Sequence, residues 1–161
     1  MNQVIVVGSY NQDHVWVSDE LPAPGATRSG RYLSGPGGKG FNQAVASARS
    51  ATATAFLVAL GDDAAAQHAR ALATGFGIDL IDEVHGDVAT GSAGIFVDAR
   101  GRNVIVVAPG ANAALSTRFI DREAARIRAA VVTLAQLEVD RGAIFRALSI
   151  ARGAGQRTIL N

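Results

Sequence analysis

The chain has 161 residues, a formal net charge of +1 and no cysteine. This length suits one domain or part of a larger one, and the lack of cysteine excludes disulfides, thiolate metal sites and a cysteine nucleophile. The balanced charge gives no nucleic-acid footprint and no membrane-surface patch, and no apolar run approaches the ~20 residues of a membrane helix. Because the start also lacks a basic and apolar leader, the sequence predicts a soluble, cytoplasmic protein.

The first half of the chain alternates between strand-like and helix-like segments. Residues 4–7 are continuously apolar and β-branched, which is typical of a strand buried on both faces of a parallel sheet. The following predicted elements are a weak strand, a helix, a buried strand and a helix, at 27–34, 39–50, 54–60 and 64–74. This order predicts an α/β fold.

The second half begins with a different pattern. Two strand-like runs, 93–98 and 103–107, flank a short glycine-containing turn and predict a hairpin, and hence a separate small sheet. The elements predicted after it are a helix, a strand, a helix and the start of a strand, at 116–129, 131–134, 140–153 and 158–161. The printed sequence therefore stops within an apolar strand, which indicates a truncated α/β unit.

The segment 35–44 is the most informative stretch of the sequence. It places four glycines, Lys39 and Asn42 at the start of a predicted helix. Glycine lets the backbone approach a ligand closely, and the first amides of a helix lack partners within the helix. The segment therefore predicts a compact site for a small, oxygen-rich molecule, with a plain glycine-rich turn as the alternative.

Two phosphate-binding patterns fit this segment poorly. The P-loop pattern fails because Leu33 stands where its first glycine should be and Gly40 where it needs Ser or Thr. The dinucleotide pattern G-x-G-x-x-G matches literally at 35–40, but it belongs after the first strand of the sheet. A dinucleotide-binding oxidoreductase fragment is thus a distant alternative.

Polar residues also follow two predicted sheet strands. Asn11 and Asp13 come after the first strand, and their spacing of two puts both side chains on one side of an extended segment. Ligands of open α/β sheets bind at such strand ends, although an Asx turn is equally compatible. Glu138 follows the strand 131–134 and is either a ligand contact or a charge at the start of a helix, and Asn112 has the pattern of a turn residue.

The remaining titratable residues show no site pattern. The three histidines lack metal-ligand spacing, and the aspartates at 62, 63, 79 and 82 fit no known cation loop. We expect surface and helix-capping roles for them.

Together these segments resemble the ribokinase-like family of sugar and nucleoside kinases, and within it most of all the ribokinases. The residues that carry the resemblance appear in the family's order: Gly8-Ser9-x-Asn11-x-Asp13, Gly37-Gly38-Lys39-Gly40-x-Asn42-Gln43-Ala44-Val45-Ala46, Gly61-Asp62-Asp63, Thr90-Gly91, Gly110-Ala111-Asn112-Ala113-Ala114-Leu115 and Gln136-Leu137-Glu138.

The resemblance implies a fold and an activity. The fold is a three-layer, Rossmann-like, mainly parallel sheet with a small β-sheet lid, whose segments are about 11–36 and 93–107. The activity is transfer of the γ-phosphoryl group of ATP to the 5-hydroxyl of D-ribose or a similar pentose, with Mg²⁺ and a monovalent cation such as K⁺. The implied sugar-binding residues are Asn11, Asp13, Gly38, Lys39, Asn42 and Glu138. In the family the lid closes over the sugar and often pairs with a second subunit, so a homodimer is expected.

The resemblance also implies what this sequence lacks. Family members are roughly twice as long, and their catalytic aspartate, anion hole and ATP- and cation-binding residues lie in the second half. We therefore expect residues 1–161 to be the N-terminal, sugar-binding half, without a catalytic residue and inactive alone. The alternatives are a non-catalytic sugar-binding module or pseudo-kinase, and a fructose or nucleoside kinase of the same family.

Overall fold

A computed structural model describes residues 4–161; the first three residues of the predicted domain 1–161 lie outside this description. The larger part of the molecule is built on a five-stranded sheet in which every pair of neighbours is parallel. Its strands, in spatial order, are β5 (Asp79–His85), β4 (Thr54–Gly61), β1 (Val4–Val7), β8 (Val132–Ala135) and β9 (Arg157–Leu160). The continuous apolar runs of the sequence correspond to the central strands, since β4 is buried at all its positions.

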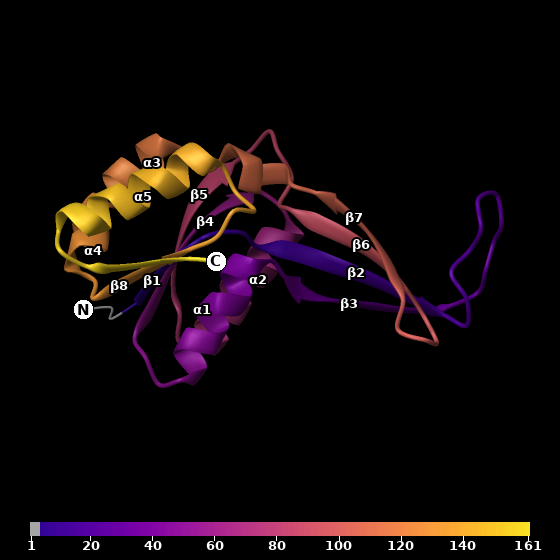
Figure 1. Cartoon of the computed structure of the whole chain (residues 1–161). Helices are drawn as coiled ribbons and strands as arrows, with labels where there is room; N and C mark the ends of the chain where they lie inside the picture. Colours follow the sequence, from indigo (N-terminus) through magenta and orange to yellow (C-terminus); the bar gives the residue numbers. More distant parts are fainter. Residues whose placement is uncertain (1–3) are drawn as a thin grey trace.

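Helices cover both faces of this sheet (Figure 1). On one face lie α1 (Lys39–Arg49) and α2 (Ala64–Gly75), and on the other lie α3 (Thr117–Arg122), α4 (Ala124–Ala129) and α5 (Arg141–Gly153). The side chains of β1 alternate between the two cores: Val6 packs with the first pair of helices, and Ile5 and Val7 with the other three. Among the described residues, no helix has the length and hydropathy needed to cross a membrane.

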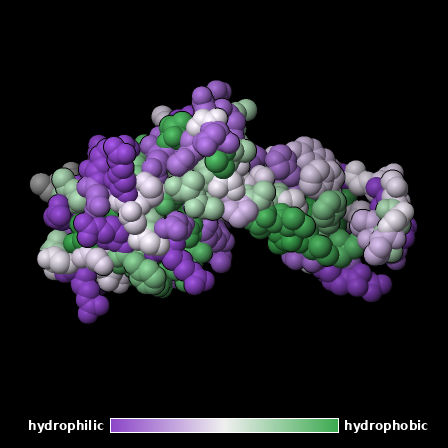
Figure 2. All heavy atoms as spheres, turned by 90° about the horizontal axis from the view of Figure 1, so that it is seen from above, coloured by the Kyte–Doolittle hydropathy of each residue, from purple (hydrophilic) through white to green (hydrophobic). Residues whose placement is uncertain are grey.

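A second sheet extends from this body as an arm (Figure 1). Its strands, in spatial order, are β3 (Arg31–Gly37), β2 (Asn11–Ser18), β6 (Ser92–Asp98) and β7 (Asn103–Ala108). All residues of β7 are exposed, and Figure 2 shows hydrophobic atoms gathered along the arm. A mixed α/β fold with a mainly parallel sheet and a separate small sheet is therefore confirmed.

Two sequence-based boundaries were wrong, and one strand was missed. The weak strand expected at 27–34 lies instead at Arg31–Gly37, because its pairing with β2 runs from Val17–Arg31 to Asn11–Gly37. The helix expected at 116–129 is broken at Glu123, a break that no proline or glycine announces and that leaves both short helices packed on α5. The strand β5 was missed, since its three acids and exposed positions disguise a sheet edge.

Candidate functional site

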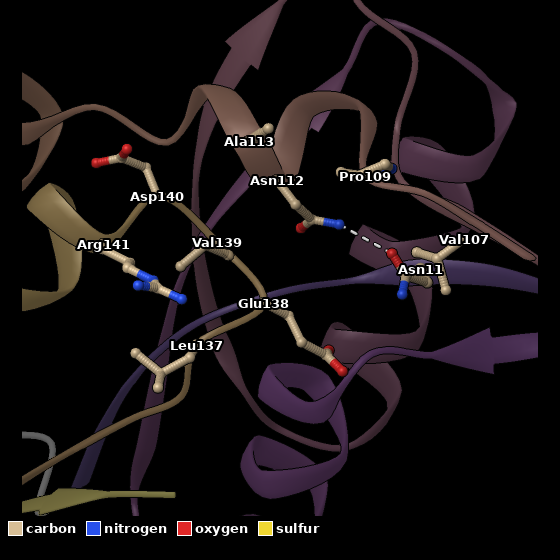
Figure 3. A pocket seen from close by; sticks show the side chains of 10 residues that line it. All are labelled: Asn11, Val107, Pro109, Asn112, Ala113, Leu137, Glu138, Val139, Asp140 and Arg141. Carbon is tan, nitrogen blue, oxygen red and sulfur yellow. Dashed lines mark hydrogen bonds between the residues drawn. The ribbon is translucent and has the colours of Figure 1, made fainter.

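A pocket of about 520 Å³ opens at the carboxyl ends of β1 and β8, where ligands of open α/β sheets bind. Its walls come from the start of β2, the end of β7, the 3₁₀ helix η1 (Gly110–Ala114) and the segment between β8 and α5 (Figure 3). The lining residues are Asn11, Val107, Pro109, Asn112, Ala113, Leu137, Glu138, Val139, Asp140 and Arg141.

Glu138 is held at the edge of this pocket by the start of α1. Its Oε2 accepts hydrogen bonds from the Ser9 hydroxyl at 2.7 Å and from the Lys39 backbone N–H at 2.9 Å. The Lys39 Nζ lies 3.5 Å from the other carboxylate oxygen. Burial raises the pKa of Glu138, but these hydrogen bonds and the Lys39 charge outweigh it and hold the pKa below its usual value. The carboxylate is therefore ionised and fixed in place.

The first amides of α1 are not free for a ligand, contrary to the sequence-based expectation. The Lys39 amide is bound to Glu138, the Gly40 amide donates to the Ser9 hydroxyl at 3.3 Å, and the Phe41 amide donates to the Ser9 carbonyl at 2.9 Å. A helix start does have unpaired donors, but the sequence does not reveal that Ser9 and Glu138 supply the acceptors.

Asp13 projects from the same face of β2 as Asn11; in the register with β3, Asn11 pairs with Gly37 and Asp13 with Gly35. A Cβ on Gly37 would collide with the Asp13 carboxylate, which explains the glycine. Burial, and then the negative charge of Glu138, raise the pKa of Asp13, with a smaller lowering by His14. Among the described residues, no hydrogen bond to the Asp13 side chain is found. Two neighbouring carboxylates thus differ: one is satisfied by the protein, and the other is unsatisfied.

A buried asparagine pair sets the orientation of Asn11. The Asn112 Nδ2 donates to the Asn11 Oδ1 at 2.8 Å (Figure 3). It also donates to the Tyr10 carbonyl at 2.9 Å, while the Asn112 Oδ1 accepts from the Tyr10 N–H at 3.1 Å. Because its oxygen is engaged, Asn11 keeps its amide N–H groups for a ligand. A Cβ on Gly91 would collide with both amides.

Asn112, whose local pattern predicts a turn residue, orients a side chain of this site. It is buried in η1, and its role depends on residues about 100 positions away. The signal available in the sequence was its place in the Gly-Ala-Asn-Ala-Ala-Leu segment. The apolar lining by Val107, Leu137 and Val139 was also not foreseen.

The expected site residues are only partly brought together. Asn11, Asp13, Lys39 and Glu138 are linked by contacts or by charge around one strand end. Gly38 caps α1 with φ +89°, packed against the backbone of Ser9 to Asn11. The Asn42 side chain is exposed, and we find no hydrogen bond that ties it to the others among residues 4–161.

Residues 4–161 contain no group of three or more His, Asp or Glu side chains placed to hold a metal ion. The amides that could have bound a phosphate are occupied, as described above. The Asp13 carboxylate and the Asn11 amide, by contrast, offer an acceptor and a donor that can hydrogen-bond a hydroxyl-rich molecule.

Comparison with known proteins agrees with this chemistry. A model of the pfkB family of carbohydrate kinases matches residues 1–161. The bifunctional ribokinase/ribose-5-phosphate isomerase A of Fructilactobacillus sanfranciscensis is 41% identical over 167 residues, which cover 100% of this chain and 30% of that protein. The ribokinase of Mus musculus is 34% identical over 171 residues, covering 98% of this chain and 50% of that protein.

A solved structure shows the same similarity to ribokinases. The structure of Arabidopsis thaliana ribokinase complexed with ribose and ATP aligns with a TM-score of 0.83 and 30% identity, and covers 99% of this chain and 53% of the plant chain. The chain thus spans about half the length of the ribokinases that it matches.

Proposed function

This chain belongs to the pfkB family of carbohydrate kinases, and we propose that it forms the sugar-binding half of a ribokinase-type enzyme. The proposed reaction transfers the γ-phosphoryl group of ATP to the 5-hydroxyl of D-ribose or a similar pentose. The observation that carries the proposal is the unsatisfied Asp13 carboxylate beside an Asn11 amide whose N–H groups are left free.

These two side chains suit a vicinal diol. Asp13 accepts a hydrogen bond from one hydroxyl, and the Asn11 amide donates to the next, so both hydroxyls are oriented. Lys39 adds a donor beside Glu138, and the backbone of Gly38 allows the sugar to approach. Val107, Leu137 and Val139 contact the carbon skeleton of the sugar and exclude water. We also propose that Asn42, in the first turn of α1, contacts the sugar.

Phosphoryl transfer depends mainly on positioning and on stabilising the charge of the transferred group. We propose no catalytic residue within residues 1–161, because the family resemblance places the catalytic aspartate and the ATP- and cation-binding residues in the second half of full-length members. Use of ATP, Mg²⁺ and K⁺, and a cytoplasmic location, are proposals that rest on the family. We expect the 161-residue chain to bind sugar without phosphorylating it. ATP turnover above background in a coupled ATPase assay with ribose would contradict this.

The binding proposal is tested by titrating the ¹⁵N-labelled 161-residue chain with D-ribose. We expect saturable shifts at Asn11, Asp13, Gly38 and Lys39, and none at the exposed hairpin turn around Gly101. Saturable binding that leaves those residues unshifted, or no binding at millimolar ribose, would remove the proposal.

Other members of the same family remain the alternatives. D-fructose and adenosine in the same titration distinguish a fructose or a nucleoside kinase, because the preferred sugar should displace ribose in an Asp13-dependent way. Joining residues 1–161 to the second half of a full-length ribokinase distinguishes a kinase half from a non-catalytic binding module. We expect an active hybrid if residues 1–161 are a kinase half. An inactive hybrid would favour the non-catalytic module.

We also propose that the small sheet closes over the sugar and pairs with a second copy of the chain. In support, Ile105 on β7 is 49% exposed in a row of exposed aliphatic side chains and lies on the same face of the small sheet as Val107 of the sugar pocket. Ile105→Lys should shift the chain towards monomer in light scattering. Val131→Lys is a matched control on the body, since Val131 is 63% exposed, and it should have no effect. A chain that is monomeric before either change would refute the pairing.

A further inference from the structure

A second cavity, of about 490 Å³, lies against the opposite face of β2. Gln12 and His14 alternate along this strand with Asn11 and Asp13, so they point away from the pocket described above. The register pairs His14 with Ser34 on β3 and Gln12 with Ser92 on β6, which brings four polar side chains to this face. The start of α2, with His68, closes the cavity from the body of the molecule.

The hydrogen bonds of Gln12 indicate which ring nitrogen of His68 carries a proton. The Gln12 Nε2 donates to the Gly35 carbonyl at 3.1 Å, so its Oε1 is an acceptor. The His68 Nδ1 lies 3.1 Å from that oxygen and therefore carries a proton, as does the Tyr10 hydroxyl at 3.2 Å. In the neutral imidazole this leaves the His68 Nε2 as a hydrogen-bond acceptor beside the cavity.

His14 gives the cavity a flat aromatic wall. Its ring stacks on Trp16 at 6.3 Å and on Tyr32 at 6.1 Å, and Trp16 stacks in turn on Phe96 at 5.2 Å between centroids. The Tyr32 hydroxyl lies 2.7 Å from the His14 Nδ1 and holds the ring in this orientation. His14 is the member of this aromatic row that lines the cavity, so a planar ligand there can extend the stack.

The charge of the lining indicates a neutral ligand. No Lys, Arg, Asp or Glu lines this cavity among the described residues, and the Ser92 hydroxyl has no hydrogen-bond partner in the same part of the chain. The cavity thus combines an aromatic wall, an imidazole acceptor and a hydroxyl. These groups match a planar heterocycle with both donors and acceptors on its edge.

We propose that this cavity is a second ligand site, distinct from the sugar pocket, which takes a neutral nucleoside. The base stacks on the His14 end of the aromatic row, and its edge bonds to His68 and Ser92. The proposal does not rest on the proposed kinase function, because it uses the opposite face of β2 and no residue of the sugar pocket.

Trp16 is the single tryptophan of the sequence and reports directly on this wall. Adenosine should change the Trp16 fluorescence, excited at 295 nm, in a saturable way at submillimolar to millimolar concentration. His68→Leu, an exposed change on α2, should weaken this binding at least fivefold. Asp13→Asn should leave it unchanged, and AMP should bind no more tightly than adenosine, since no cation meets its phosphate.

Each other result overturns the proposal. Loss of adenosine binding in Asp13→Asn but not in His68→Leu would place the nucleoside in the sugar pocket. AMP binding tenfold tighter than adenosine would mean an anion site, and no saturable change would mean no nucleoside site. A melting curve of His68→Leu that matches the unaltered chain excludes misfolding as the cause of lost binding, and D-ribose titrations separate a failure here from a failure of the proposed function.

Discussion

The same four residues, Val-Ile-Val-Val, occur twice in this chain with opposite surroundings. In β1 they are the centre of the parallel sheet, where Ile5 is 1% exposed. In β7 they are the edge of the small sheet, where Ile105 is 49% exposed. Because local sequence is identical, the difference must come from what the rest of the chain packs against each strand.

This contrast separates stability from function. The body is covered by helices on both faces, so its apolar side chains leave water and stabilise the fold. The small sheet keeps much of its apolar surface exposed and carries polar side chains on both faces of β2. We expect changes in the body to lower stability, and changes in the small sheet to alter binding and association.

The largest expected effect tests the contrast directly with a matched pair. Ile5→Ala leaves a cavity in the sheet core and should lower the free energy of unfolding by ~2–5 kcal/mol. Ile105→Ala, in the same tetrapeptide, should change it by no more than ~0.5 kcal/mol. Denaturant unfolding measures both, and equal losses would show that the small sheet is as much a part of the core as the body.

The next effect concerns Asp13 on the inner face of β2. Asp13→Asn removes a charged acceptor and should weaken ribose binding by ~2–3 kcal/mol, or roughly 30–150-fold. Folding disfavours the charged form of Asp13, as its raised pKa shows, so the same change should leave thermal stability equal or higher near neutral pH. Calorimetric titration measures the ribose affinity, and melting curves measure the thermal stability. A marked loss of stability with unchanged affinity would make Asp13 a structural residue.

Asn112 connects the two regions and should affect both quantities. Asn112→Ala leaves the buried Tyr10 backbone groups unpaired and should cost ~1–3 kcal/mol of stability. It also frees the Asn11 amide to rotate, so ribose affinity should fall. Asn103→Ala, on exposed β7, is the control and should change neither. Loss of stability with unaltered affinity would limit Asn112 to a structural role.

The smallest effect is one of pH. The raised pKa of Asp13 means that it gains its proton above the ordinary aspartate range near ~3.9 as pH falls. The pKa of Glu138 is lowered, so Glu138 stays ionised there; its contribution to stability is lost only at lower pH, through its folded-state pKa. Ribose affinity should therefore decline before the fold does. Asp13→Asn should remove this decline, and a decline that persists in that variant would implicate another group.

The sequence by itself determined the class of the fold and most of the elements. Continuous β-branched runs, capped amphipathic helices and a glycine-containing hairpin are local patterns, so they predict strands, helices and a separate small sheet without tertiary information. Edge strand β5 and the break at Glu123 escaped, because an edge tolerates acids and because no helix breaker stands at that position.

Only the tertiary structure decided which residues meet. Ser9 and Glu138 accept hydrogen bonds from the first amides of α1, and Asn112 orients Asn11. The contacts of Glu138 and Asn112 join residues that are about 100 or more positions apart in the sequence. The sequence also could not distinguish the buried Val-Ile-Val-Val of β1 from the exposed one of β7. Burial and hydrogen-bond pairing depend on neighbours supplied by distant segments, so a local pattern predicts what a segment is, and the packing of the whole chain decides what it does.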